Sequence, residues 1–284
     1  MASVAIGDID VEYTDVGSGP PVVFVHGAYV TGALWDDVVD RLSDRHRCIA
    51  PTFPFGAQAE SVGPGVDLGV HSSGRRIVAF LESLELSDVT LVANDTGGGI
   101  VLAALGNAML NWDRVSKLVF TNCDSFEHFP PKSFAPLVRL CALSQTLGSI
   151  ALKALTTGPG LNAFSSTVTR NGIDAARRPA IFGGFLTSAA VRHEAARFTA
   201  GLKPSHTMSA VNALKLWTKP VLIAWGTSDK LFPLSHAHRL AETFPAAVVR
   251  TIEDSSTYVM LDRPEDAAEA IREFVAGPTE EVAQ

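Results

Sequence analysis

The stretch Val89-Thr-Leu-Val-Ala-Asn-Asp-Thr-Gly-Gly-Gly99, followed by the apolar residues 100–105, decides the fold of this chain. An apolar, β-branched run that stops at an Asp between small residues and continues with helical periodicity predicts a strand, a sharp turn and a helix. The turn forces Asp95 into a strained backbone conformation, which requires small residues at Ala93 and Gly97. We therefore expect the Asp95 side chain to stand exposed above the end of the strand.

This arrangement is typical of a nucleophile elbow, and through it the chain resembles the α/β-hydrolase superfamily. Asp at the elbow resembles the branch of haloalkane dehalogenases and epoxide hydrolases, and the resemblance extends over nearly the whole chain. It implies that Asp95 is the nucleophile. The alternative is a surface Asp in an ordinary βα turn of a Rossmann-like sheet. A dinucleotide site is less favoured, because Gly97, Gly98 and Gly99 lack the spaced glycine pattern.

Length and composition allow one large core. The 284 residues are 46% apolar, and 23 Lys and Arg against 30 Asp and Glu give a formal charge of −7, which argues against electrostatic binding of nucleic acid. Cys48, Cys123 and Cys141 are too few and too irregularly spaced for a disulfide framework or a zinc site. We expect them to be buried thiols in a reducing compartment. Without a basic leader or a run of transmembrane length, the expected location is cytoplasmic, with no membrane partner.

Strand and helix patterns alternate from residue 21 to residue 124, which predicts a parallel sheet with helices on both faces. Before them, residues 3–16 alternate in the manner of an edge hairpin. One of the expected helices covers about 72–86 and leads into the elbow strand. At the other end of the chain, fraying is expected from Pro278 onward.

Residues 125–215 break this rhythm with helical segments and Gly, Pro and Ser breaks, and strand patterns return after them. The resemblance implies an α/β-hydrolase fold, with a mostly parallel eight-stranded sheet flanked by helices. It further implies a core domain of residues 1–124 and 216–284 and a helical lid of residues 125–215. The many apolar residues of the lid predict a largely apolar cavity above the elbow.

The strand that starts at Pro21 runs into His26-Gly27-Ala28-Tyr29, which matches the oxyanion loop of the superfamily. The resemblance implies that the backbone N–H groups of Ala28 and Thr96 form the oxyanion hole. His26 is expected to be a structural residue that fixes this loop by hydrogen bonds.

The stretch that ends at Asp229 matches the seventh-strand motif of the superfamily, whose Asp is the acid of the catalytic triad. In the last loop, the flanking residues Asp254, Ser255 and 260–264 align Thr257 with the position of the family's histidine. In Asp-nucleophile hydrolases, that histidine activates the water that hydrolyses the ester intermediate. Threonine has no basic nitrogen, so ester formation is compatible with this change but turnover is not.

Two solutions to the missing histidine stay open. Another histidine reaches the site, with His128 the best placed; the candidates are His128, His193, His206, His236 and His238. For His236 and His238, exposed positions on a helix are the favoured interpretation. Alternatively, the reaction needs no hydrolytic water, and Asp95 acts as acid or base with its pKa raised toward neutrality by an apolar pocket.

Markers of the substrate are weak. Dehalogenases that resemble this chain carry Trp directly after the nucleophile, where Thr96 stands here, and epoxide hydrolases supply tyrosines from the lid. The tyrosines of this chain all lie outside the expected lid: Tyr13, Tyr29 and Tyr258. Tyr29 serves either as a phenolic donor or in packing. The candidate substrate contacts are Tyr29, Phe126 and His128.

The function favoured by these motifs is that of an α/β-hydrolase-family enzyme acting on a small, mainly apolar organic molecule. Asp95 is its nucleophile or acid/base, and Asp229 and Thr257 are the remaining members of the site. The resemblance implies no cofactor and no metal. One alternative is a non-hydrolytic lyase, isomerase or cyclase of secondary metabolism. Another is a ligand-binding protein that kept the pocket and lost turnover. Only hydrolysis incorporates solvent oxygen into the product, which separates the two enzyme classes.

Overall fold

The computed structural model describes residues 1–277, so the tail for which fraying is expected lies outside the described residues. One eight-stranded sheet carries the fold, in the strand order β1-β2-β4-β3-β5-β6-β7-β8. The strands are β1 (Ala2–Ile6), β2 (Ile9–Val16), β3 (Pro21–Val25), β4 (Arg47–Pro51), β5 (Val89–Asn94), β6 (Val115–Cys123), β7 (Val221–Gly226) and β8 (Ala247–Ile252). The β1–β2 and β2–β4 pairs are antiparallel and the others parallel, which confirms the edge hairpin and the mostly parallel eight-stranded sheet.

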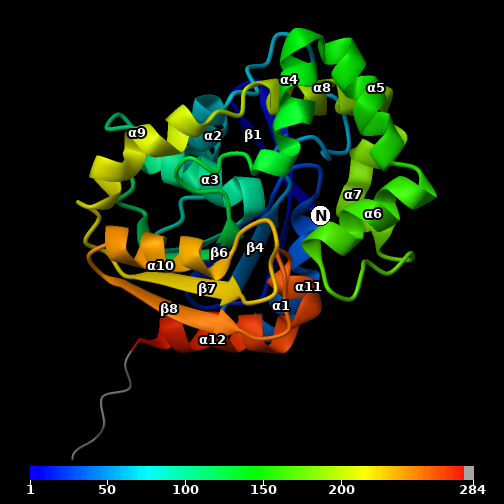
Figure 1. The fold of residues 1–284 in the computed structure, drawn as a ribbon. Coiled ribbons are helices and arrows are strands. Elements are labelled where there is room, and N and C mark those ends of the chain that lie inside the picture. Colours follow the sequence, from blue (N-terminus) through cyan, green and yellow to red (C-terminus); the bar gives the residue numbers. More distant parts are fainter. Residues whose placement is uncertain (278–284) are drawn as a thin grey trace, which may run out of the picture.

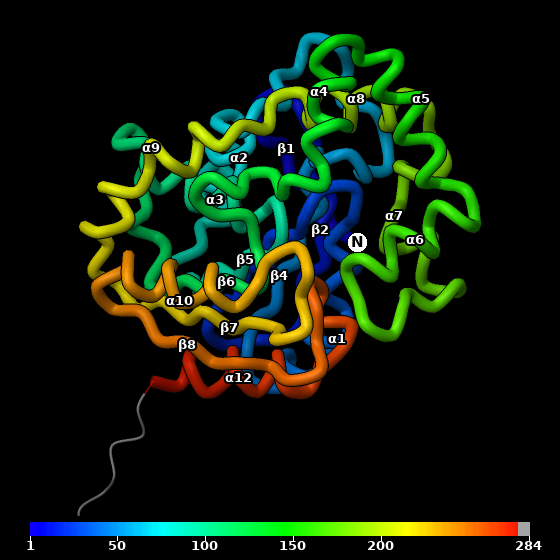
Figure 2. Tube along the Cα trace, viewed as in Figure 1, coloured from blue at the N-terminus to red at the C-terminus, as the bar shows by residue number. Residues whose placement is uncertain are grey.

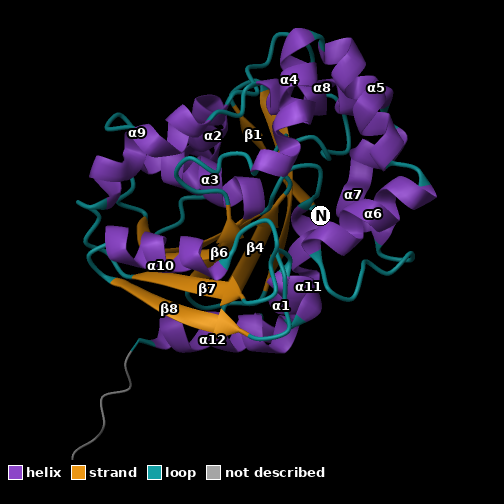
Figure 3. Cartoon of the chain, in the orientation of Figure 1, coloured by secondary structure: helices purple, strands orange, loops and turns teal. Residues whose placement is uncertain are grey.

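Helices cover both faces of the sheet (Figure 1, Figure 3). One face carries η1 (Gly32–Trp35), α1 (Asp36–Leu42), α11 (Val259–Asp262) and α12 (Pro264–Ala276), and the other carries α2 (Val70–Ser83), α3 (Asp95–Leu105) and α10 (Leu234–Thr243). Along β5, Leu91 and Ala93 pack on the α2–α3 side and Val92 packs on the α1–α12 side. This alternation arises because successive side chains of a strand point to opposite faces.

The helix expected over about 72–86 begins at Val70 and ends at Ser83. It ends early because Glu85 takes a left-handed backbone conformation, with φ of 51°, which stops the helix. The chain then turns directly into β5. No helix within residues 1–277 combines the length and the hydropathy that a membrane span requires.

The chain between β6 and β7 is helical. It forms η2 (Lys132–Phe134), α4 (Ala135–Leu143), α5 (Gln145–Leu155), α6 (Gly158–Val168), α7 (Arg178–Thr187), α8 (Ala189–Ala200) and α9 (Pro204–Leu214). Helices α4 to α7 lie on the side toward which the arrows of β7 and β8 point, as the ribbon and the tube both show (Figure 1, Figure 2). This segment therefore stands over the carboxyl ends of the parallel strands.

Helix α9 differs from its neighbours because it packs against the core helix α3. At that contact, a Cβ added to Gly106 would lie 2.8 Å from the Cβ of Ala210, so glycine permits the close approach. The last helix of the expected lid segment thus contacts the core. The division into a core of residues 1–124 and 216–284 and a lid of residues 125–215 stays a prediction.

Candidate active site

Asp95 stands at the turn between β5 and α3, at the centre of the sheet. Its φ is 51°, in the left-handed region that non-glycine residues avoid. Crowding explains the small residues around it: a Cβ added to Gly97 would lie 2.3 Å from the carbonyl oxygen of His26. The strained turn expected from the sequence is therefore present, and it aims the carboxylate away from the strand.

The backbone N–H groups of Ala28 and Thr96 both act on the Asp95 carboxylate and lower its pKa. A Cβ added to Gly27 would lie 2.1 Å from Oδ2 of Asp95, so only glycine lets the carboxylate lie against this loop. The two donors expected to form an oxyanion hole thus converge on one point, where they stabilise negative charge.

His26 fixes the loop that carries Ala28. Its Nδ1 donates to the carbonyl oxygen of Gly27 at 2.7 Å, and its Nε2 accepts from the backbone N–H of Phe53 at 2.9 Å. Burial lowers the pKa of His26 to about 4 despite these bonds, so the ring is neutral at neutral pH. The contacts agree with the structural role expected for this residue.

Asp229 is buried beyond the end of β7 and accepts a hydrogen bond from each of four donors. Its Oδ2 accepts from Nδ2 of Asn122 at 2.8 Å and from Oγ1 of Thr257 at 2.9 Å. Its Oδ1 accepts from the backbone N–H groups of Leu231 at 2.7 Å and Phe232 at 3.1 Å. Asp229 and Thr257, far apart in the sequence, therefore meet as the alignment of the last loop requires.

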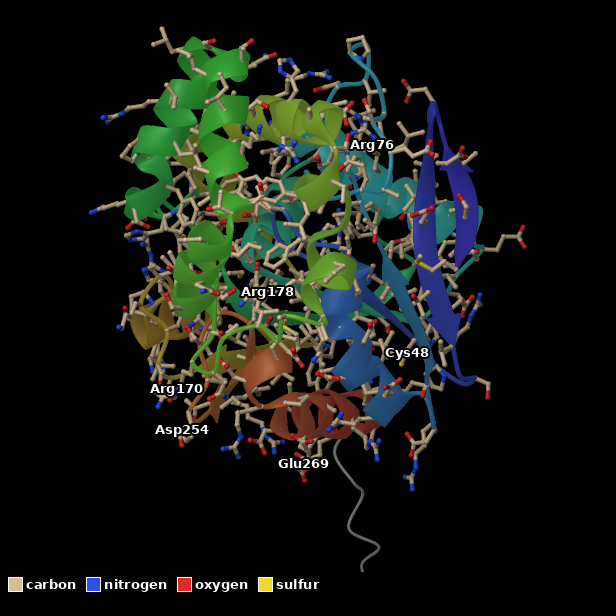
Figure 4. All side chains as sticks on the ribbon, turned by 90° about the vertical axis from the view of Figure 1, so that its right-hand side faces the viewer. Cys48, Arg76, Arg170, Arg178, Asp254 and Glu269 are labelled. Atoms are coloured by element: carbon tan, nitrogen blue, oxygen red, sulfur yellow. The ribbon has the colours of Figure 1, made fainter. Side chains whose placement is uncertain are left out.

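The loop that carries Thr257 is anchored from two sides. Nδ2 of Asn94, the residue before Asp95, donates to the carbonyl oxygen of Thr257 at 2.8 Å. From the helical segment, Arg170 forms an ion pair with Asp254 at 3.8 Å, and the two residues lie side by side in Figure 4. Thr257 is fully buried by this packing. The hydroxyl group of Thr257 is thus held against Asp229 by contacts from Asn94 and Arg170, which are distant from Thr257 in the sequence.

Burial raises the pKa of Asp95 to about 7. The N–H groups of Thr96 and Ala28 lower it and the charge of Asp229 raises it, so burial is the dominant cause. A second acid, Asp124, is fully buried directly after β6; burial and the charge of Asp95 raise its pKa well above its ordinary value. Asp95 therefore titrates near neutral pH beside a second buried acid whose pKa is also raised.

A cavity lies over Asp95. Ala28, Tyr29, Asp95 and Thr96 form its polar end. The rest of the lining comes from the helical segment and nearby loops: Pro130, Pro131, Phe134, Val138, Phe164, Val168, Thr199, Leu202 and Leu231. The lining is mainly apolar, which agrees with the character expected from the sequence.

Tyr29 lines this cavity with its hydroxyl group bonded to Oγ1 of Thr199. Its ring stacks on Phe185, with ring centroids 5.1 Å apart. Burial raises the pKa of Tyr29, so the phenol is neutral. Tyr29 therefore packs in the site with its hydroxyl group bonded to Thr199, and its role as a phenolic donor stays a prediction.

The other two candidate substrate contacts lie outside the cavity lining. Phe126 takes a left-handed conformation, with φ of 51°, and its ring lies under the guanidinium of Arg239 at 3.9 Å. His128 stacks on His236 and lines a separate surface hollow. None of the chain's eight histidines lines the cavity over Asp95.

Three residues of the site carried little signal in the sequence. Asn122 and Thr199 are ordinary polar residues within a strand and a helix, and only their contacts with Asp229 and Tyr29 distinguish them. Asp124 offered one signal, an acid directly after an apolar strand. Within residues 1–277, no group of three or more His, Cys, Asp or Glu side chains is arranged to hold a metal ion.

A family model described as alpha/beta hydrolase fold matches residues 20–264. The chain is 29% identical over 278 residues to a cis-3-alkyl-4-alkyloxetan-2-one decarboxylase of Shewanella oneidensis, with 93% of this chain and 84% of that protein covered. It is 28% identical over 272 residues to haloalkane dehalogenase 2 of Mycobacterium bovis, with 93% and 90% covered.

Solved structures show the same fold. An alpha/beta hydrolase fold protein of Burkholderia ambifaria superposes with a TM-score of 0.81 at 21% identity, over 95% of this chain and 96% of that one. A putative ancestral haloalkane dehalogenase superposes with a TM-score of 0.79 at 20% identity, over 97% and 98%. At these identities the likeness concerns the architecture alone.

Proposed function

We propose that this chain, which belongs to the α/β-hydrolase family, is an enzyme. It converts a small, mainly apolar organic molecule without consuming water. Asp95 is the reacting carboxylate in this proposal. The backbone N–H groups of Ala28 and Thr96 stabilise the charge that develops beside it. Tyr29 and the apolar lining of the cavity hold the substrate.

The contact between Thr257 and Asp229 carries the proposal. A hydrolase of this kind needs a base that removes a proton from water, and the buried acid normally orients that base. Here Oγ1 of Thr257 donates to Oδ2 of Asp229 at 2.9 Å, and a hydroxyl group is no base at neutral pH. Since no histidine lines the cavity, reactions that need an activated water are disfavoured.

Asp95 suits a reaction in which a carboxylate attacks carbon or moves a proton within the substrate. With a pKa of about 7, both its ionised and its protonated form are populated at neutral pH. The ionised form is a nucleophile or a base, and the protonated form returns the proton. In an elimination or isomerisation, the proton that Asp95 takes up returns to the leaving group or to another carbon of the substrate. In the decarboxylation of a four-membered cyclic ester, attack of Asp95 on the carbon that bears the ring oxygen breaks that C–O bond, and loss of carbon dioxide from the freed carboxylate then expels Asp95 as the alkene forms.

One relative supports this class of reaction. The protein of Shewanella oneidensis is named for the decarboxylation of an oxetan-2-one, a four-membered cyclic ester. Breaking one C–O and one C–C bond of that ring gives an alkene and carbon dioxide, so the equation contains no water. The haloalkane dehalogenase relative is named for the loss of halide, and replacing that halide with a hydroxyl group needs water.

Product analysis in ¹⁸O-labelled water tests the proposal. Purified protein is incubated with a cis-3,4-dialkyloxetan-2-one, a terminal epoxide and a 1-haloalkane of matched chain length, and products are identified by mass spectrometry. We expect sustained turnover only where the product contains no solvent oxygen, and a loss of roughly 10³-fold or more with Asp95→Asn. Steady release of an ¹⁸O-labelled alcohol, diol or acid would contradict the proposal. Binding without any product would favour a ligand-binding protein.

A further inference from the structure

A second hollow, here called the mouth hollow, opens on the surface beside the cavity of Asp95. It is lined by His128, Lys132 and Lys230 and by the start of α10, including His236. Pro131 and Leu231 line both the mouth hollow and the cavity. Two apolar residues are therefore shared by the linings of the two spaces, so the mouth hollow is a direct neighbour of the cavity.

Positive charge dominates the lining of the mouth hollow. Lys132 and Lys230 are exposed, and neither forms an ion pair within 4.0 Å with any residue in 1–277. No Asp or Glu lines the hollow. Glu127, the neighbour of His128 in the chain, is bound by Arg239 through both carboxylate oxygens, at 2.7 and 2.8 Å, and lies 3.6 Å from Nε2 of His128. Its charge is thus already compensated.

Two further features favour an anion here. His236 is 8% exposed, and its Nδ1 has no hydrogen-bond partner among residues 1–277, which is uncommon for a buried polar atom. Its ring stacks on that of His128, with centroids 4.3 Å apart. Helix α10 begins at Leu234, directly after a residue that lines the hollow, and the N-terminal end of a helix carries partial positive charge.

We propose that the mouth hollow binds the carboxylate of an amphiphilic substrate whose apolar body lies in the cavity of Asp95. This inference deepens the proposed function and rests on it, because it names the class of molecule that the cavity receives. Two separated lysine ammonium groups suit a carboxylate, whereas no arginine lines the hollow to offer the bidentate grip that phosphate recognition commonly uses. The negative charge of Asp95 disfavours the opposite orientation, with the carboxylate inside.

Calorimetric titration with octanoate and octanamide tests the proposal, because the two ligands differ mainly in charge. We expect the unmodified protein to bind octanoate about fivefold more tightly than octanamide, the effect of two exposed ion pairs. The double variant Lys132→Met/Lys230→Met should abolish this preference. Lys153→Met, which removes an exposed lysine of α5 that does not line the hollow, should preserve it.

Three outcomes would overturn the proposal. The first is equal or tighter binding of octanamide by the unmodified protein, and the second is a preference for octanoate that persists in the double lysine variant. The third is acetate binding as tight as octanoate with the same dependence on the lysines, which would indicate a site for free anions. Because binding is measured and not turnover, the result is independent of whether the water-free reaction is correct.

Discussion

Oγ1 of Thr257 lies 2.9 Å from Oδ2 of Asp229, and this hydrogen bond saturates the buried acid of the site. Asn122 and the backbone N–H groups of Leu231 and Phe232 supply the other donors, so each carboxylate oxygen of Asp229 accepts two hydrogen bonds. Asp229 thus occupies the position of the family's triad acid, but it orients the hydroxyl group of Thr257 in place of an imidazole. The chemistry left to the site centres on Asp95.

Replacement of Asp95 by Asn should abolish catalysis and leave the fold intact. Asn keeps the size of the side chain but removes the charge and the capacity to exchange a proton. We expect a loss of roughly 10³-fold or more in product formation. Asp113→Asn, at an exposed loop position, is the matched control and should retain activity. Full activity of the Asp95 variant would place the chemistry elsewhere.

Thr257→His should introduce the base that hydrolysis needs. The new imidazole can take over the hydrogen bond to Asp229, which would orient its other nitrogen toward the substrate side. With an alkylating substrate, intact-mass spectrometry should show an ester on Asp95 that is shorter-lived than in the unmodified protein. Thr257→Val, which removes the hydroxyl without adding a base, should not shorten the adduct lifetime. If the ester on Asp95 lives equally long in Thr257→His and in the unmodified protein, the new imidazole is not oriented toward the substrate side by Asp229.

The rate should depend on pH through Asp95. If the ionised carboxylate reacts, kcat/KM should rise about tenfold for each pH unit below the pKa of about 7 and level off above it. The rise should be missing from the residual rate of Asp95→Asn. A profile that is flat from pH 5 to pH 8 would show that ionisation of Asp95 does not limit the reaction.

Stability should depend on pH in the opposite direction. Because burial raises the pKa of Asp95 from 3.8 to about 7, the folded state binds the proton more tightly than the unfolded state. The contribution of protonated Asp95 to the free energy of unfolding is therefore complete below about pH 4 and is lost as the pH rises through 7. Asp95→Asn should therefore gain stability relative to the unmodified protein between pH 4 and pH 8. Urea unfolding at both pH values measures the difference, on the order of 1–3 kcal/mol.

Asp229→Ala should destabilise the protein more than any single change among its partners. The variant leaves four donors without their acceptor, two of them backbone N–H groups of the loop after β7. We expect the free energy of unfolding to fall by about 2–4 kcal/mol. Thr257→Val removes only one of these bonds and should cost about 1 kcal/mol. Equal effects of the two variants would mean that the loop does not depend on the Asp229 carboxylate.

The sequence alone was sufficient for the architecture and for the elements that carry the site. The strand, the turn at Asp95 and the helix after it follow from local periodicity and from the small residues that a strained turn requires. The loop of Ala28 and the strand before Asp229 were located by their resemblance to motifs of the superfamily, which are likewise short stretches of the chain. Such patterns are readable because each depends on residues that are neighbours in the chain.

Only the tertiary structure decided which side chains meet. Phe126 and His128 follow β6 closely, but their side chains pack against Arg239 and His236 of α10, away from the cavity. Conversely, Asn122 gained a role because β6 lies beside β7, which brings its amide to Asp229. Side-chain direction and pKa depend on contacts between residues far apart in sequence and on burial, and local periodicity contains neither.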